Sequence, residues 1–265
     1  MQLFGKPADQ HHRSMRFAII GDIHAGFAKA DAMVRRHCGP VDAIFSVGDA
    51  EPNRTEADSL GVGGPAKYRK VGDFPEFVAG WRAMNAPVYF IGGNHEPWPS
   101  LDAHGPGEWA PGFHFLGRSG VREVAGLQVA FLSGIYSRHF SEPDVPPAVT
   151  SERLKEYGYF TRPQVNLLLD QARGKKIDLL LTHEWPAGLS YLHRGKEPVG
   201  RDAIRALTDR LSPQVHACGH MHTPFRERVG VTDVVCLSQV AYGPDAVTVL
   251  ELASDGTLKE LPTHV

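Results

Sequence analysis

Short apolar runs alternate with polar and glycine-rich segments along the chain, and their lengths predict buried strands. The clearest runs cover residues 17–20, 43–47, 88–91 and 178–181, and a weaker one covers 214–218. Amphipathic stretches near 28–37 and 75–84 lie between the first three runs and predict helices. This alternation of strand and helix predicts a layered α/β fold whose first sheet is parallel.

The pattern changes after Trp98. Residues 121–124 and 127–132 are apolar runs joined at Ala125-Gly126, which predicts an antiparallel hairpin. Thr161 and Gln164 form a capping-box signal that opens a helix through Ala172. A helix near 201–211 and a C-terminal meander over 227–240 and 246–252 complete the predicted elements. Two facing sheets flanked by helices fit this order best.

Two stretches, residues 52–72 and 136–160, are rich in glycine or proline and predict no regular structure. Connections of this length in a compact domain are often functional. The 265-residue chain has 42% hydrophobic residues, enough for one globular domain over residues 15–265. The first 14 residues are polar and are expected to form a disordered arm.

Charge and cysteine content narrow the class of protein. A net charge of -2 argues against extensive coating of nucleic acid or an anionic membrane, since such binding needs many uncompensated cations. No apolar run approaches the length that spans a membrane. The three cysteines show no Cys-x-x-Cys spacing, so the sequence predicts neither a disulfide framework nor a zinc knuckle. A reducing, cytoplasmic location is expected.

Ligand-rich segments directly follow the predicted strands. Because strand ends of an α/β sheet form its binding crevice, we expect the segments to meet there. A lone His183 or His216 would be typical of a hydrogen-bonded core histidine, and only the ordered set favours a metal site. The segments are Gly21-Asp22-Ile23-His24, Gly48-Asp49, Gly92-Gly93-Asn94-His95-Glu96, Thr182-His183-Glu184 and Gly219-His220-Met221-His222.

Carboxylates mixed with imidazoles favour two divalent transition-metal ions, such as Mn, Fe or Zn, over Mg or Ca. Asp22 with His24, and His220 with His222, have the spacing that lets both side chains of a pair point the same way. Two cations roughly 3.5–4 Å apart can share a hydroxide that attacks phosphorus, and Asp49 is the expected bridging ligand. The sequence therefore predicts a phosphoester hydrolase.

His95 follows Asn94 directly and is the expected general acid for the leaving oxygen. Such a group contributes about 10²–10⁴-fold to the rate. Glu96 is expected to orient His95.

Taken together, these segments resemble the calcineurin-like metallophosphoesterase superfamily over about residues 16–223. The resemblance implies a four-layer αββα sandwich with two mixed sheets flanked by helices. It implies that Asp22, His24, Asp49 and His222 hold one metal ion. It also implies that Asp49, Asn94, His183 and His220 hold the other, with His95 close to the phosphoryl group.

Within the superfamily the chain is most similar to the RNA lariat debranching enzymes. The similarity lies in residues 40–43, 54–58, 67–69, 91–96, 109–111, 133–135 and 182–186. Debranching enzymes commonly carry a cysteine at the position of Asp22, so this chain has the usual two-metal ligand set instead. Pro52 stands where the protein-phosphatase branch has an aspartate, which disfavours a protein phosphatase.

In the debranching enzymes, the segment that matches residues 136–160 is a substrate-recognition loop. Its cations and aromatic rings could pair with phosphates and stack on bases. An ordinary solvated loop explains them equally well. The candidate substrate contacts are Arg138, His139, Arg153 and Tyr157.

Three functions remain open from the sequence. A phosphodiesterase or phosphatase acting on nucleic acid or a nucleotide has the complete ligand set in its favour. A phosphatase of small metabolites would use the same set. A non-catalytic interaction scaffold on the same fold is disfavoured, because no ligand has been lost.

Overall fold

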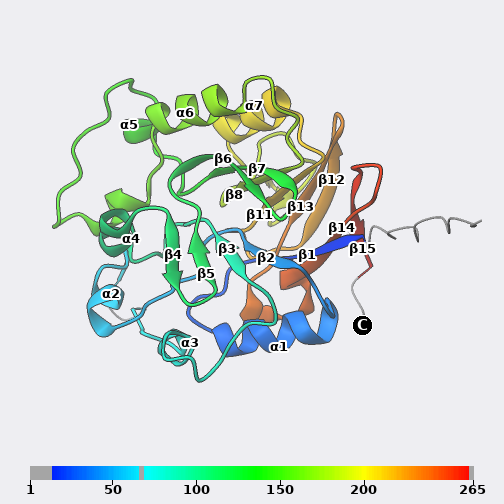
Figure 1. Cartoon of the computed structure of the whole chain (residues 1–265). Helices are drawn as coiled ribbons and strands as arrows, with labels where there is room; N and C mark the ends of the chain where they lie inside the picture. Colours follow the sequence, from blue (N-terminus) through cyan, green and yellow to red (C-terminus); the bar gives the residue numbers. More distant parts are fainter. Residues whose placement is uncertain (1–13, 66–68, 263–265) are drawn as a thin grey trace, which may run out of the picture.

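Two mixed sheets face each other in the middle of the molecule, and helices cover their outer faces (Figure 1). The computed structural model describes residues 14–65 and 69–262. The expected N-terminal arm, except for its last residue, lies outside the described residues. The order of layers is helix, sheet, sheet, helix, which confirms the predicted αββα sandwich.

The first sheet contains seven strands. They are β1 (Met15–Ile20), β2 (Ala43–Ser46), β3 (Val88–Phe90), β4 (Gly107–Ala110), β5 (Phe113–Phe115), β14 (Val247–Leu252) and β15 (Leu258–Leu261). Their spatial order is β15-β14-β1-β2-β3-β5-β4. The central strands β1, β2, β3 and β5 are parallel, whereas β14, β15 and β4 are antiparallel to their neighbours.

The second sheet contains six strands. They are β6 (Ser119–Val124), β7 (Leu127–Leu132), β8 (Leu179–Thr182), β11 (Val215–Cys218), β12 (Phe225–Val229) and β13 (Thr232–Cys236). Their spatial order is β12-β13-β11-β8-β7-β6, with parallel pairing from β13 to β7 and antiparallel strands at both edges. A separate short pair joins β9 (Leu192–His193) to β10 (Glu197–Pro198).

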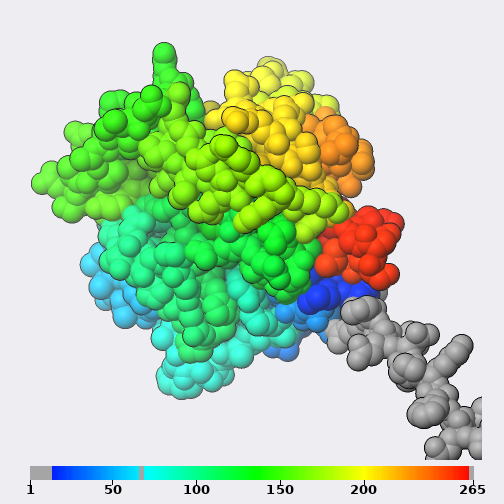
Figure 2. Space-filling view, turned by 45° about the horizontal axis from the view of Figure 1, so that its top comes forward, coloured from blue at the N-terminus to red at the C-terminus, as the bar shows by residue number. Residues whose placement is uncertain are grey.

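Helices lie on opposite sides of the sandwich (Figure 1). The α-helices are α1 (Phe27–His37), α2 (Glu56–Leu60), α3 (Phe74–Val78), α4 (Trp98–His104), α5 (Arg138–Ser141), α6 (Arg162–Ala172) and α7 (Asp202–Leu211). The 3-10 helices include η2 (Leu154–Gly158), η3 (Val240–Tyr242) and η4 (Pro244–Ala246). Helix α1 packs on the first sheet, and α6 and α7 pack on the second. Figure 2 shows the face formed by α6 and α7, coloured yellow-green to yellow, with the green part of the chain beside them.

Alternation along β1 explains why its apolar run is continuous. Phe17 and Ile19 point into the core between the two sheets, whereas Ala18 and Ile20 point toward α1. Successive side chains of a strand face opposite sides of its sheet, so a sheet covered on both faces needs apolar residues at every position. The same physical reason accounts for the apolar runs in β2, β7 and β8.

Several local predictions are confirmed. The backbone N–H of Thr161 donates to Oε1 of Gln164 at 2.9 Å, and this capping box opens α6. Strands β6 and β7 form the expected hairpin, in which Ala125 and Gly126 both have positive φ angles. Two consecutive left-handed residues suit the tight turns that join antiparallel strands.

Three predictions were wrong in detail. Helix α3 ends at Val78 instead of continuing to Met84, because Gly80 adopts a φ of 74° that breaks the helical path. The stretch 52–72 contains helix α2, whose Thr55 hydroxyl accepts a hydrogen bond from Asp58 N. The stretch 136–160 contains α5 and η2.

The predicted C-terminal meander was also wrong, because its strands belong to different sheets. Strands β12 and β13 form a hairpin in the second sheet. Strand β13 is already paired with β12 on one edge and β11 on the other, so no edge remains for the next strand. The chain crosses through η3 and η4, and β14 pairs antiparallel with β1.

The cysteines and helices agree with the sequence-based exclusions. Cys38, Cys218 and Cys236 are buried free thiols, although the Sγ atoms of Cys218 and Cys236 lie 3.3 Å apart. In the described ranges 14–65 and 69–262, every helix is too short or too polar to cross a membrane.

His216 lies inside the second sheet between two threonine hydroxyls. Its ring nitrogens lie 2.7 Å from Oγ1 of Thr182 and 3.0 Å from Oγ1 of Thr208, and the residue is fully buried. Burial lowers the pKa of His216 to about 3. His216 is therefore a hydrogen-bonded core histidine.

We expect acid to destabilise the protein through His216. The ordinary pKa of a histidine is 6.5, and the pKa of His216 in the folded protein is about 3. Between these values the unfolded chain binds a proton that the folded protein excludes, so the free energy of unfolding falls as the pH drops below 6.5. The expected loss is about 2 kcal/mol at about pH 5. Urea unfolding of the wild type and His216→Gln at neutral and acidic pH measures this, and equal pH slopes would contradict it.

Candidate metal centre

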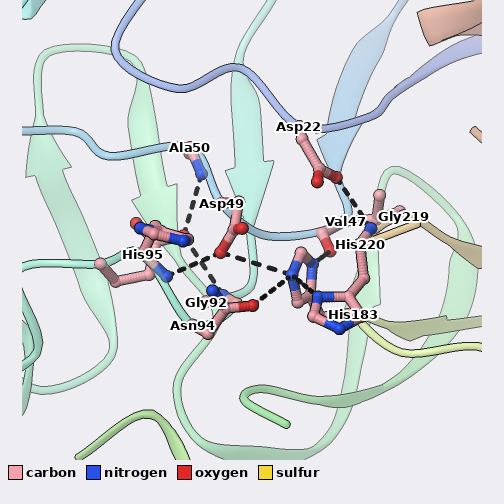
Figure 3. A network of polar contacts seen from close by, with 12 residues as sticks. Asp22, Val47, Asp49, Ala50, Gly92, Asn94, His95, His183, Gly219 and His220 are labelled. Atoms are coloured by element: carbon pink, nitrogen blue, oxygen red, sulfur yellow. Dashed lines mark hydrogen bonds and ion pairs between the residues drawn. The ribbon is translucent and has the colours of Figure 1, made fainter. Parts of the chain in front are cut away.

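The candidate ligands follow the carboxyl ends of parallel strands from both sheets. The two sets of strand ends meet at one edge of the sandwich, where the labelled side chains converge (Figure 3). This is the edge at which α/β sheets bind ligands. Asp22 and His24 follow β1, Asp49 follows β2, Asn94 and His95 follow β3, His183 follows β8, and His220 and His222 follow β11.

One group of potential metal ligands consists of Asp22, His24 and His222, whose ligand atoms lie within 4.8 Å of one another. Nε2 of His222 lies 2.9 Å from Oδ2 of Asp22 and 3.3 Å from Nε2 of His24. Asp22 is fully buried. These atoms could hold one cation.

A second group consists of Asp49, His183 and His220, again with ligand atoms within 4.8 Å of one another. Nε2 of His183 lies 3.3 Å from Oδ1 of Asp49 and 3.2 Å from Nδ1 of His220. Oδ1 of Asn94 also lies 3.3 Å from Nε2 of His183. The structure thus places the Asn94 side chain beside the second group.

Asp49 lies between the two groups. Its Oδ1 faces His183, and its Oδ2 lies 4.0 Å from Nε2 of His24 in the first group. The backbone N–H of His95 donates to Oδ1 at 2.7 Å, which fixes the orientation of the carboxylate. One carboxylate oxygen is therefore directed to each group.

The hydrogen positions around His183 test whether these residues fit a cation. Nδ1 faces the carbonyl oxygen of Val47 at 2.9 Å, so it carries the proton and leaves a lone pair on Nε2. That lone pair faces oxygens of Asp49 and Asn94 that are themselves acceptors. Oδ2 of Asp22 is likewise buried and accepts no hydrogen bond of good geometry, although Nε2 of His222 lies 2.9 Å away. Acceptors gathered around one point fit a metal ion.

The electrostatics of this site also favour positive charge. Burial alone lowers the pKa of His183, but the Asp49 carboxylate outweighs burial and raises the pKa to about 10. Burial raises the pKa of Asp49, but the His183 charge outweighs it and holds that pKa well below its usual range. A bound cation would be stabilised by the same negative charge that otherwise favours the protonated form of His183.

Two glycines allow the ligands to approach the backbone. A Cβ at Gly93 would lie 2.3 Å from Oδ1 of Asp49 and 2.6 Å from Nε2 of His183. A Cβ at Gly219 would lie 2.2 Å from Oδ1 of Asp22. Any larger residue at either position would displace a candidate ligand, which explains these two glycines.

Four candidate ligands adopt the left-handed backbone conformation. The φ angles are 48° for His24, 48° for Asp49, 68° for His220 and 51° for His222. Non-glycine residues rarely adopt such angles, and each costs of the order of 1 kcal/mol. Strain of this kind clusters at functional sites, where the surrounding structure holds the residue in place.

His95 opens into a hollow beside the first group. The hollow has a volume of about 520 Å³ and is also lined by Lys70, Gln239 and Tyr242. The ring centroid of His95 lies 5.4 Å from that of His24. A substrate held at the candidate metal centre could therefore reach His95.

Glu96 does not have the expected contact with His95. Its Oε1 accepts hydrogen bonds from the backbone N–H groups of Ala50 and Gly93, and its Oε2 accepts one from Glu51. Burial raises the pKa of Glu96 to about 8, and the nearby Asp49 charge adds to the effect. Through these contacts Glu96 instead fixes the loop that carries Asp49.

Glu51 is a site residue that the sequence analysis missed. It is buried, and its Oε1 lies 2.7 Å from Nδ1 of His24, so the imidazole donates to the carboxylate and directs Nε2 at the candidate metal centre. Burial lowers the pKa of His24, but the hydrogen bond to Glu51 and the charges of Asp49 and Glu51 together outweigh burial and raise that pKa above its usual value. The only sequence signal was an acidic residue two positions after Asp49.

Glu184 also has a role that the sequence did not specify. Nε of Arg201 donates to its Oε1 at 2.8 Å, and the backbone N–H of Tyr136 donates to its Oε2. Glu184 is buried next to His183 in the chain. It therefore ties the start of the 136–160 segment to the strand that carries a candidate ligand.

The four candidate substrate contacts are not brought together. Arg138 and His139 line a separate hollow of about 570 Å³, whose lining contains none of the candidate metal ligands. Arg153 is exposed and pairs with Glu156 at 3.1 Å. Tyr157 is partly buried and packs against the hydrophobic core between the first sheet and its outer helices. The end of the segment nevertheless lies near the site, since a Cβ at Gly158 would be 3.4 Å from Cα of Asn94.

Comparison with known proteins agrees with this geometry. The family model for calcineurin-like phosphoesterase matches residues 15–224. The lariat debranching enzyme of Schizosaccharomyces pombe is 31% identical over 202 residues, which cover 70% of this chain and 43% of that protein. The lariat debranching enzyme of Homo sapiens is 29% identical over 234 residues, which cover 80% of this chain and 42% of that protein. The chain thus spans less than half of these relatives.

Solved structures share the fold at much lower identity. The crystal structure of TT1561 of Thermus thermophilus has a TM-score of 0.54 and 12% identity, and the match covers 94% of this chain and 99% of that one.

Proposed function

The chain belongs to the calcineurin-like phosphoesterase family, and from this premise we propose that it hydrolyses phosphodiesters of a nucleic acid or nucleotide at a dinuclear metal centre. The observation that carries the proposal is the pair of ligand groups joined by Asp49. Family membership supports phosphoester hydrolysis, and the pair of groups supports two metal ions.

In this proposal Asp22, His24 and His222 hold one cation. His183, His220 and Asn94 hold the other, and Asp49 serves both. The mixture of imidazole nitrogens and carboxylate oxygens favours manganese, iron or zinc. When bound, the two cations would supply an activated water and neutralise the charge on the phosphoryl oxygens.

The protein's own groups would orient the candidate ligands and deliver a proton. The hydrogen bond from Glu51 keeps His24 in one tautomer, and the Val47 carbonyl does the same for His183. His95 faces the hollow and would deliver a proton to the leaving oxygen. The Glu96 contacts with backbone amides would hold the Asp49 loop rigid while this occurs.

The substrate class rests on the relatives and on the 136–160 segment. The similar proteins of fission yeast and human are lariat debranching enzymes, which makes 2′,5′-linked RNA one candidate among nucleic-acid diesters. Arg138 and His139, in their separate hollow, would contact a strand that extends beyond the metal centre. The three free thiols support a cytoplasmic location.

A panel of substrates tests the proposal. Metal-loaded protein is assayed on a monoester, a small diester, a cyclic diester, an oligonucleotide and a 2′,5′-linked dinucleotide. We expect cleavage of diesters, and we expect Arg138→Ala to reduce oligonucleotide cleavage more than small-diester cleavage. Hydrolysis of monoesters alone would instead indicate a phosphatase of small metabolites. No hydrolysis at all would favour a binding scaffold.

Glu51→Gln should weaken the metal site that contains His24. The variant keeps the side-chain size but loses the charge that orients the imidazole, and such outer contacts are typically worth about 10–100-fold in metal affinity. Calorimetric titration with Mn²⁺ should show one weakened site and one close to wild type. Glu56→Gln, an exposed change on α2, is the matched control. Equal weakening of both sites would contradict this role.

A further inference from the structure

Tyr242 is an exposed aromatic residue beside the candidate metal centre. Tyr242 is 70% exposed, whereas most large aromatic residues in the described ranges are buried. The ring lies 5.9 Å from that of His222, nearly perpendicular to it at 79°. The ring is therefore open to solvent next to the candidate metal centre, where a ligand could contact it.

The segment that carries Tyr242 is fixed to the candidate ligands by hydrogen bonds. Val240 N donates to the carbonyl oxygen of Asp22 at 2.9 Å, and Oγ of Ser238 donates to that of His222 at 2.9 Å. Val240 is buried, and Tyr242 N donates to Gln239 O at 2.9 Å. The backbone that carries the ring therefore has a defined position relative to the metal centre, and a ligand would not have to order this segment.

The hollow beside Tyr242 has the size and polarity of a small-molecule site. Its volume of about 520 Å³ lies within the roughly 300–1,000 Å³ typical of such sites. Lys70 contributes a cation and Gln239 an amide, and Glu51 is the acidic residue of the lining, where it is already bonded to His24. A phosphoryl group at the metal centre would place its organic substituent in this hollow.

A second hollow on the other side of the centre is a poorer place for a ring. It has a volume of about 190 Å³ and lies next to His220. Its aromatic lining residue, Trp185, is buried, and its cation, Arg201, is bonded to Glu184. The two sides of the centre thus differ, and only the Tyr242 side offers an exposed aromatic face among the described residues that line these hollows.

We propose that Tyr242 forms a stacking platform for a nucleobase of the substrate, with Lys70 and Gln239 contacting the polar edge or sugar of that nucleotide. The proposal rests on the proposed function, since the phosphoryl group must bind at the metal centre. Aromatic stacking favours a base over a bare sugar but distinguishes the four bases weakly. The site would therefore select nucleotides as a class.

Binding to uncleavable probes tests the proposal. The probes are the phosphonate analogues of adenosine 5′-monophosphate and of ribose 5-phosphate, in which a CH₂ group replaces the ester oxygen. Stacking of one base corresponds to roughly 5- to 150-fold in affinity. Metal-loaded wild-type protein should bind the adenosine probe more tightly than the ribose probe by a factor in that range.

The variants separate stacking from other roles. Tyr242→Ala should reduce the preference for the adenosine probe to near one, and Tyr242→Phe should keep it. Trp81→Ala, which removes an exposed aromatic ring that does not line the hollow, should also keep it. Equal affinity of the wild type for both probes, or no binding of either, would overturn the proposal. An equal loss for both probes, or loss of metal in Tyr242→Ala, would show that the ring positions His222 instead.

Failure of the nucleobase platform can be distinguished from failure of the proposed hydrolase function. If the wild type cleaves no phosphoester in the substrate panel but prefers the adenosine probe, the hydrolase proposal fails and the nucleotide site stands. If it cleaves small diesters without any preference between the probes, the hydrolase proposal stands and the nucleobase platform is wrong.

Discussion

Replacing Asp49 with alanine is expected to empty both metal sites and to lower kcat/KM by roughly 10³-fold or more. The reason is the position of the carboxylate between the groups. Oδ1 lies 3.3 Å from Nε2 of His183, and Oδ2 lies 4.0 Å from Nε2 of His24. Removing one side chain therefore takes a negative ligand away from each cation, whereas loss of any other candidate ligand affects one group.

Metal analysis together with kinetics measures this effect. Wild-type protein should contain close to two transition-metal ions per chain after removal of free metal. In Asp49→Ala neither metal site should be fully occupied. Asp102→Asn is the matched control, because Asp102 is a partly exposed carboxylate that pairs with Arg118 and belongs to neither ligand group. Full occupancy of two sites in Asp49→Ala would remove Asp49 from the bridging role.

His95→Asn is expected to slow hydrolysis of esters with poor leaving groups by about 10²–10⁴-fold. An alkoxide leaves only when it receives a proton, and the His95 side chain lines the hollow next to His24 and His222. A p-nitrophenolate leaves without help. The same variant should therefore lose much less activity on p-nitrophenyl esters.

The comparison between the two leaving groups isolates one proton transfer. His104→Asn serves as the control, since His104 lies at the end of α4 and bonds the carbonyl oxygen of Gly105. Metal content must stay at the wild-type value in both variants. If His95→Asn slows both kinds of ester equally, His95 binds the substrate or shapes the site and is not the general acid.

Much of the fold followed from local sequence signals. Strands β1, β2, β3 and β8 are buried on both faces, so each appeared as an unbroken apolar run. The capping box at Thr161 and the turn at Ala125-Gly126 depend on neighbouring residues alone. Strand β14 could not be assigned to its sheet in this way, because its partner β1 lies more than 200 residues earlier in the chain.

The candidate site likewise contains residues that the sequence identified and contacts that only the structure reveals. The candidate ligands Asp22, Asp49 and His183 were identified because each follows a predicted strand. Glu96 was assigned to His95 because the two are adjacent in the chain, but folding brings the amides of Ala50 and Glu51 to its carboxylate. Tyr242 had no signal at all, since nothing near it in the sequence indicates a metal centre.

The sequence by itself determined the chemistry of the ligands, the strands that present them and the αββα class. These properties depend on residue type and on spacing of a few positions, which alternation and capping convert directly into structure. The tertiary structure alone decided which oxygen of Asp49 faces which group, that Glu51 directs His24, and that Tyr242 lies beside His222. Those relations join residues from separate strands and both sheets, so they arise only when long-range packing fixes distances that no local pattern encodes.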